Sequence, residues 1–127
     1  MKIVVSNHDE VPIYEQIKRQ ILDAILSGAL SPGDALPSLR ALSRDLAIGV
    51  LTVNRAYAEL ESEGYVENIQ GKGCYVAQKS AALLKEHLLA DASDKMAQAI
   101  SLAQRAGQSD EEMRALFNQC LRRRRDG

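Results

Sequence analysis

The chain has 127 residues, of which 46% are hydrophobic and 26% charged, with a formal net charge of −1. This suits one ordinary folded domain, or one small domain with an appendage, and excludes a disordered chain. No apolar run approaches the roughly 18 residues that span a bilayer, and the charged segment at positions 7–10 comes too early for a signal peptide. We therefore expect a cytoplasmic protein without a membrane contact.

The first part of the chain is expected to form an extended arm and a helix. Residues 1–11 hold a short apolar run, and Pro12 then opens a helix at a position where its missing N–H costs nothing. Gly28 ends this helix, and residues 31–34 form a turn. The apolar stripe of the helix comprises Ile13, Ile17, Ile21, Ala24 and Ile25.

Two short helices with a tight turn between them follow. Ser38 is the expected N-cap of the first, and residues 47–49 form the turn. The second helix ends at Gly64 and has a divided surface. Its apolar residues recur at the spacing i, i+3, i+4, i+7, which predicts a stripe facing a core: Val53, Ala56, Tyr57 and Leu60. The opposite face carries Leu51, Arg55, Ala58 and Ser62. A helix that enters the major groove of DNA needs such a surface, apolar behind and polar in front.

A β-hairpin is expected after the second helix. Residues 65–69 and 74–77 have strand composition, and a glycine-rich turn at 70–73 joins them. This turn lacks the spacing of a nucleotide phosphate loop and precedes a strand instead of a helix. The order of helix, turn, helix and hairpin predicts a winged helix-turn-helix domain over residues 1–79. Such domains bind DNA, and others bind proteins, so the pattern alone leaves both functions open.

The charge pattern of this domain favours nucleic acid more than the net charge does. Between Arg40 and Arg55 there are three arginines and one acid, Asp45, whereas Glu59, Glu61 and Glu63 follow at the far end of the second helix. The basic residues therefore lie where a groove would be met. The modest total charge predicts an affinity for DNA that depends on dimerisation.

The remainder, residues 80–127, is predicted to be a helical dimerisation segment. A long helix over 81–106 is followed by a break at Gly107, and Ser109 with Glu112 forms a capping box before a last helix. Two helices cannot bury their apolar stripes alone, whereas a second copy would complete a bundle. The residues expected to hold the homodimer together are Leu84, Leu88, Met96, Ile100, Met113, Leu116, Phe117 and Leu121. The arginine run 122–125 is interpreted as a solvated helix end favoured by the helix dipole, with an auxiliary phosphate or protein contact as the alternative.

The spacing of the cysteines, histidines and acids does not match a catalytic or metal-binding motif. Cys74 and Cys120 are far apart, and neither C-x-x-C nor H-x-x-x-H occurs, so we expect free thiols and no metal. No pair of nucleophile and base is visible, and the acids at 110–112 suit the first turn of a helix. We expect no cofactor and no enzymatic activity.

Several motifs at fixed spacing resemble one known family. The segments VPIYEQI, GALSPGDALPSLRALS, TVNRAYAELESEG and GKGCYV are similar to those of the GntR family of bacterial transcription regulators, in particular its YtrA-like branch. The resemblance implies a homodimeric regulator, a repressor, that binds a two-fold-related operator in double-stranded DNA. It also implies that Arg40 contacts DNA from the start of the helix capped by Ser38, and that Thr52 and Arg55 contact phosphates or base edges from the helix that follows. Gly71 with Lys72 would form the wing tip at the minor groove.

The complete set of expected DNA contacts is Ser38, Arg40, Leu51, Thr52, Asn54, Arg55, Gln70, Gly71 and Lys72. The chain departs from the family at Val50, where many relatives have a side chain that can bond a base. Leu51 either contacts a thymine methyl group or packs internally. The alternative function is a winged-helix adaptor that binds proteins and not DNA. A small-molecule effector, if the protein has one, is expected between subunits or at the junction near residues 77–84.

Overall fold

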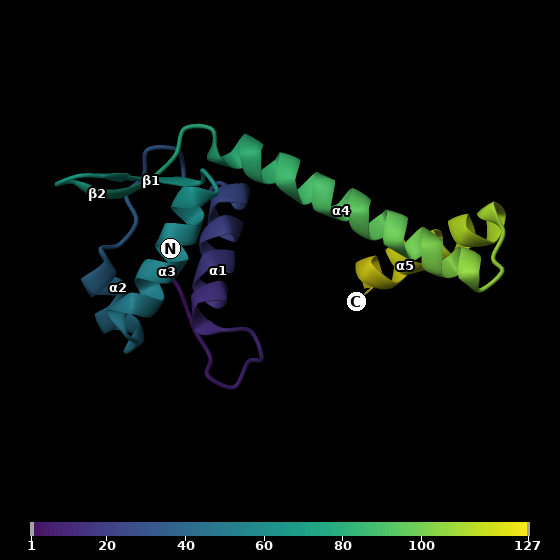
Figure 1. The fold of residues 1–127 in the computed structure, drawn as a ribbon, viewed down its shortest axis with the longest axis horizontal. Coiled ribbons are helices and arrows are strands. Elements are labelled where there is room, and N and C mark those ends of the chain that lie inside the picture. Colours follow the sequence, from purple (N-terminus) through teal and green to yellow (C-terminus); the bar gives the residue numbers. More distant parts are fainter. Residues whose placement is uncertain (1, 127) are drawn as a thin grey trace. The chain divides into compact units, whose positions relative to one another are not determined.

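The computed structural model describes residues 2–126, which form five helices and one two-stranded antiparallel sheet (Figure 1). The mainly helical class with a small hairpin is confirmed. Contacts divide the chain into two compact units, Met1–His87 and Leu88–Gly127, and each is described by itself. This division falls eight residues after the expected one at residue 79, because the first turns of α4 pack with the winged-helix domain.

The first unit has the expected order of a winged helix-turn-helix domain. Figure 1 shows α1 and α3 side by side, with the hairpin at one end of α3. The helices end within a residue or two of the predicted positions. The elements are α1 (Ile13–Ser27), α2 (Leu39–Leu46), α3 (Val50–Ser62), β1 (Val66–Ile69), β2 (Gly73–Val76) and the beginning of α4 (Ser80–Arg105).

Two glutamines hold the N-terminal arm against α1. The side-chain amide of Gln20 both accepts from the Val4 N–H (2.9 Å) and donates to the Val4 carbonyl (2.7 Å). Gln16 bonds Ser6 in the same two-way manner, at 2.8 and 2.9 Å. The arm therefore runs as an extended segment along α1, with Ile3 buried in the core.

The turn between α2 and α3 is closed by local hydrogen bonds. Ser38 caps α2, since its hydroxyl accepts from the Ala41 N–H at 3.1 Å. Ala47 ends α2 in the left-handed conformation, with φ of +55°, and its N–H donates to the carbonyl of Arg44. The hydroxyl of Ser43 donates to the carbonyl of Ile48. These bonds hold the start of α3 at a defined angle to α2.

The hairpin is anchored by a buried pair of valines and by hydrogen bonds along the edge of β2. In its register Val66 lies opposite Val76, and both are buried in the core. Next to β2, the N–H of Leu36 donates to the Cys74 carbonyl and the N–H of Val76 donates to the Asp34 carbonyl, each at 2.8 Å. The loop before α2 thus adds an edge to the hairpin, which as an isolated two-stranded ribbon would be only marginally stable.

The first two turns of α4 belong to the core of the winged-helix unit. Leu84, expected among the dimerisation residues, is only 4% exposed and packs in that core, so its assignment to a dimer face is wrong. At the next turn, the phenol of Tyr65 and Nδ1 of His87 form a hydrogen bond of 2.7 Å. An apolar stripe has the same spacing in the sequence whether it packs in its own domain or against a second copy of the chain. In α4, the first turns of the stripe pack in the winged-helix unit.

The second unit consists of the rest of α4 and of α5 (Asp110–Asp126). The predicted capping box is confirmed: Ser109 Oγ accepts from the Glu112 N–H (3.1 Å) and Glu112 Oε1 accepts from the Ser109 N–H (2.9 Å). These bonds lower the pKa of the Glu112 carboxyl. No residue of α5 is buried. Among residues 2–126, no helix combines the length and the apolar character that crossing a membrane requires.

Replacing Leu84 by alanine should lower the free energy of unfolding of the winged-helix unit by about 2–5 kcal/mol, the usual cost of truncating a buried leucine. Its exposed neighbour Lys85 provides the control, since Lys85→Ala should change that energy by no more than about 0.5 kcal/mol. Urea unfolding followed by circular dichroism measures both. Equal stabilities of the two variants would contradict the placement of Leu84 in this core.

Candidate nucleic-acid interface

Helix α3 has the divided surface that the sequence predicted. All four residues of its apolar stripe are buried, with Val53, Ala56 and Leu60 at 0% exposure. The opposite side is open: Leu51, Asn54 and Arg55 are exposed, while Thr52 is half-buried. Burial of one face therefore determines which side chains a DNA groove can meet.

At the start of α2, Arg40 and Ser38 play different parts. Both are exposed. The Ser38 hydroxyl oxygen already accepts the capping bond from the Ala41 N–H, and its own O–H can still donate to a phosphate. Arg40 lies two residues further on, in the first turn of the helix, where the unpaired N–H groups of the helix end also favour an anion.

The wing presents Lys72 on a tight turn. The N–H of Lys72 donates to the Ile69 carbonyl at 2.9 Å, and the Tyr75 hydroxyl donates to the Lys72 carbonyl at 3.1 Å. Gly71 and Gly73 have φ of +79° and +115°, which side-chain-bearing residues rarely adopt. Gln70, Gly71 and Lys72 are all exposed. The backbone of the turn is thus constrained while the lysine ammonium stays accessible.

Arg55 is held in place by two contacts that the sequence reasoning missed. Its guanidinium carbon lies 3.8 Å from the centre of the Tyr14 ring, and its Nε lies 3.4 Å from Oε2 of Glu59. Stacking on an aromatic face and a carboxylate both favour a cation at this position. The i, i+4 spacing of Arg55 and Glu59 was visible in the sequence, but nothing there paired Tyr14 of α1 with α3.

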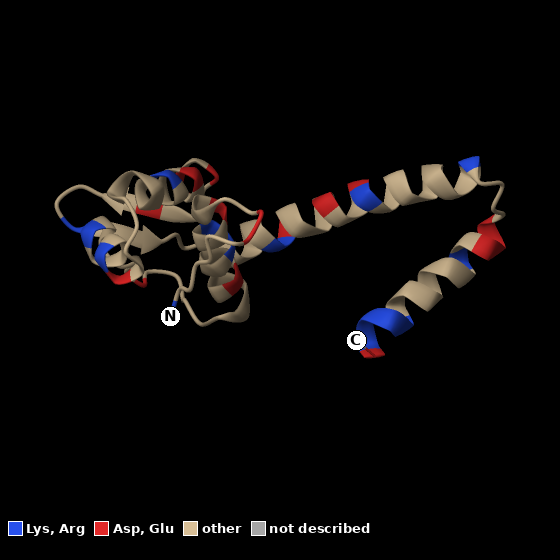
Figure 2. Ribbon diagram, turned by 90° about the horizontal axis from the view of Figure 1, so that it is seen from below, with Lys and Arg blue, Asp and Glu red and all other residues tan. Residues whose placement is uncertain are grey.

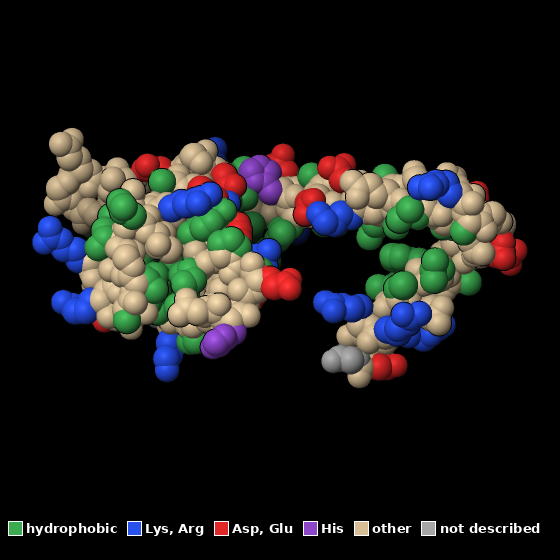
Figure 3. Space-filling model, turned by 60° about the horizontal axis from the view of Figure 1, so that its bottom comes forward, with side chains coloured by type: hydrophobic (Ala, Val, Ile, Leu, Met, Phe, Trp, Pro, Cys, Tyr) green, Lys and Arg blue, Asp and Glu red, His purple; other side chains and the backbone are tan. Residues whose placement is uncertain are grey.

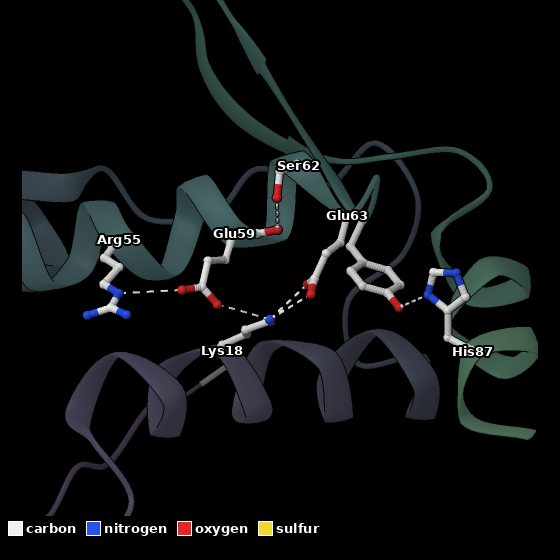
Figure 4. Close-up of polar contacts among 7 residues, drawn as sticks. Lys18, Arg55, Glu59, Ser62, Glu63 and His87 are labelled. Atoms are coloured by element: carbon white, nitrogen blue, oxygen red, sulfur yellow. Dashed lines mark hydrogen bonds and ion pairs between the residues drawn. The ribbon is translucent and has the colours of Figure 1, made fainter. Parts of the chain in front are cut away.

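Two acids at the far end of α3, Glu59 and Glu63, pair with the partly buried Lys18 of α1 (Figure 4). Lys18 of α1 is 12% exposed and its Nζ lies 3.2 Å from Glu59 and 2.8 Å from Glu63. Burial alone would lower the pKa of Lys18, but the hydrogen bonds and the charges of the two glutamates outweigh it and raise the pKa. Glu61 instead accepts a hydrogen bond from the Asn68 N–H at 2.8 Å. These carboxylates therefore serve the fold, away from the start of α3.

The comparisons with known proteins agree with this geometry. A family model described as "Bacterial regulatory proteins, gntR family" matches residues 13–76, half of the chain. The chain belongs to the GntR family. The HTH-type transcriptional repressor YtrA of Bacillus subtilis is 36% identical over 105 residues, which cover 83% of this chain and 81% of YtrA.

Solved structures support the same assignment. A transcriptional regulator from Oenococcus oeni superposes with a TM-score of 0.73 at 26% identity, covering 92% of this chain and 97% of that one. The AraR DBD in complex with operator ORE1 superposes with a TM-score of 0.51 at 26% identity, covering 61% of this chain and 94% of that one. The expectation of a GntR-family transcription regulator of the YtrA-like kind, rather than an enzyme, is confirmed.

The ion pairs of Lys18 predict a specific alkaline pH dependence. The pKa of Lys18 is raised in the folded state, so its contribution to stability is fully present below pH 10.5, the ordinary value, and is lost as the pH rises through the folded-state pKa. In Lys18→Met, the free energy of unfolding should fall less between pH 9 and 11 (chosen to bracket that value) than in the unmodified protein.

The control is Lys85→Met, at an exposed lysine, which should keep the alkaline dependence of the unmodified protein. Urea unfolding at several pH values measures the free energy of unfolding of each protein. Subtracting the profile of one protein from that of another removes the contribution of tyrosine titration, which they share. Identical pH profiles for Lys18→Met and the unmodified protein would show that the pairing does not stabilise the fold.

Proposed function

We propose that the protein is a homodimeric repressor that binds a two-fold-related operator in double-stranded DNA. The single observation that carries the proposal is the divided surface of α3, with its apolar stripe buried and its other face open. The family and the operator complex of the related AraR DBD support it. Action on chromosomal DNA would place the protein in the cytoplasm.

The contacts proposed for DNA fall into three groups. The exposed face of α3, with Leu51, Asn54 and Arg55, would enter the major groove. Arg40 would meet the backbone or a base from the start of α2. Lys72 would reach the backbone or the minor groove from the wing. Thr52 is half-buried, so a contact from it would involve its backbone or the edge of its side chain.

The second unit supports pairing with another copy. A groove of about 500 Å³ lies between α4 and α5 within this unit. Figure 3 shows hydrophobic side chains on the facing sides of both helices. Ile100 and Phe117 are each 47% exposed, which leaves apolar surface uncovered in a single copy. The apolar side chains that line the groove are Met96, Ala99, Ile100, Ala103, Met113, Leu116, Phe117 and Cys120.

The charges of α5 favour an antiparallel arrangement of the two copies. Its first turn holds the acids 110–112 and its last turns hold the arginines 122–125 (Figure 2). The centre of its apolar stripe, Phe117, lies midway between the two charged ends. Two α5 helices that cross antiparallel near Phe117 would set each acidic end beside an arginine end. This would give the arginine run a role in the dimer, whereas parallel helices would set like charges together.

One experiment distinguishes a repressor from the alternative, an adaptor that binds proteins. Purified protein is used to select DNA from a random library at low salt. Enrichment of a two-fold-related sequence supports the repressor, and absence of any enrichment would favour the adaptor. A small-molecule effector, between subunits or near residues 77–84, stays a prediction.

The selected operator allows the DNA face to be tested. Arg40→Ala should weaken operator binding by about 1–3 kcal/mol if Arg40 bonds a base, with a smaller loss on random DNA. Lys72→Ala should weaken operator and random DNA by a similar factor, and should reduce the slope of log affinity against log salt by about one unit per site. Fluorescence anisotropy at several salt concentrations measures both. Unchanged binding by both variants would contradict the proposed face.

The dimer is tested in the full chain. Phe117→Asp places a carboxylate in the apolar stripe of α5 and should convert the dimer to a monomer in sedimentation analysis, with unchanged helix content. Operator affinity should fall by at least tenfold, since two linked half-sites bind far more tightly than one. Gln108→Asp, outside the stripe, is the control. A Phe117→Asp variant that stays dimeric would refute this interface.

A further inference from the structure

The tip of the recognition helix exposes apolar side chains that the fold does not use. Val50 and Leu51, the first two residues of α3, are 42% and 82% exposed, and Leu51 is the most exposed large hydrophobic residue among residues 2–126. The hydrophobic effect disfavours this exposure, and the core of the unit contains neither residue. Internal packing, one of the two readings of Leu51 that the sequence left open, is therefore ruled out.

Leu51 and Asn54 share one face of the helix. They are three residues apart, so their side chains are neighbours, and both are exposed on the side opposite the buried stripe. Ala58, one turn beyond Asn54, is exposed and small. The helix tip is thus apolar at Leu51 and amide-bearing at Asn54. Arg55, on the same face, stacks on the Tyr14 ring and pairs with Glu59.

This combination matches one kind of base pair. In the major groove, only an A·T pair presents a methyl group, on thymine, together with the adenine N6 and N7 atoms. A leucine can contact the methyl but can bond neither a phosphate nor the polar edge of a G·C pair. Asparagine suits the adenine edge, to which it donates and from which it accepts.

We propose that Leu51 is a specificity-determining residue that packs on the C5-methyl group of a thymine in each half-site, and that the tip of α3 thereby selects A·T pairs. The inference rests on the proposed function, since it needs α3 to enter the major groove. It goes further by naming the chemical group that is read. It also gives a function to the exposure of Leu51.

The test removes only the methyl group. Each thymine of the selected operator is replaced in turn by 2′-deoxyuridine, which pairs identically with adenine. In each half-site, one of these substitutions should reduce the affinity of the unmodified protein. The loss should be about fourfold when one half-site carries it and about 15-fold when both do, as expected for the removal of one buried methyl group from each half-site. Leu51→Ala should lose a comparable factor on the thymine operator and show no further loss with deoxyuridine. Leu51→Met, still apolar and long, should keep most of the thymine dependence.

The matched control is Leu26→Ala, at an exposed leucine of α1, which should bind both operators as the unmodified protein does. Melting curves should be unchanged for all three variants because both leucines are exposed. A wild-type affinity that no deoxyuridine substitution alters would overturn the inference, as would a methyl dependence that persists in Leu51→Ala. Failure of the protein to select any DNA would instead refute the proposed function, so the two failures are distinguishable.

Discussion

The packing of α3 against α1 and the hairpin is the constraint on which the candidate interface depends. Val53, Ala56 and Leu60 are fully buried there, and the Tyr57 hydroxyl donates to the Pro37 carbonyl at 2.8 Å. That burial raises the pKa of Tyr57 well above its ordinary value, so the phenol stays protonated as a donor. Since the buried stripe cannot rotate without losing these contacts, the outward side chains of α3 are presented in one fixed orientation.

The same packing explains how a chain with a net charge of −1 keeps a basic face. Glu59 of α3 and Glu63, its C-cap, lie on the flank that meets α1, where both pair with Lys18. Glu61 is bonded to the backbone of the hairpin. The carboxylates of α3 therefore stabilise contacts within the unit, whereas Arg40 and Lys72 stay exposed. The local arrangement of charges matters more for a DNA contact than the total does.

Periodicity and capping chemistry predicted most of the elements, because both are local. The stripe of α3, the Ser38 cap and the capping box at Ser109 were read correctly from residues within one or two turns. Contacts between distant segments were not predictable in this way. The stacking of Arg55 on Tyr14 joins two helices, and the burial of Leu84 depends on which surface covers its stripe. The exposure of Leu51 needed the packed structure for the same reason.

Weak basic character and an apolar recognition tip fit together physically. Phosphate contacts supply affinity that is independent of sequence and falls steeply with salt, and each winged-helix unit offers few cations for them. A contact between leucine and a thymine methyl adds affinity at the correct base pairs alone, and salt screening does not weaken it. Linking two such units through the helical segment would multiply this small selective gain across two half-sites. Discrimination between operator and bulk DNA would then rest on shape and apolar contact more than on charge.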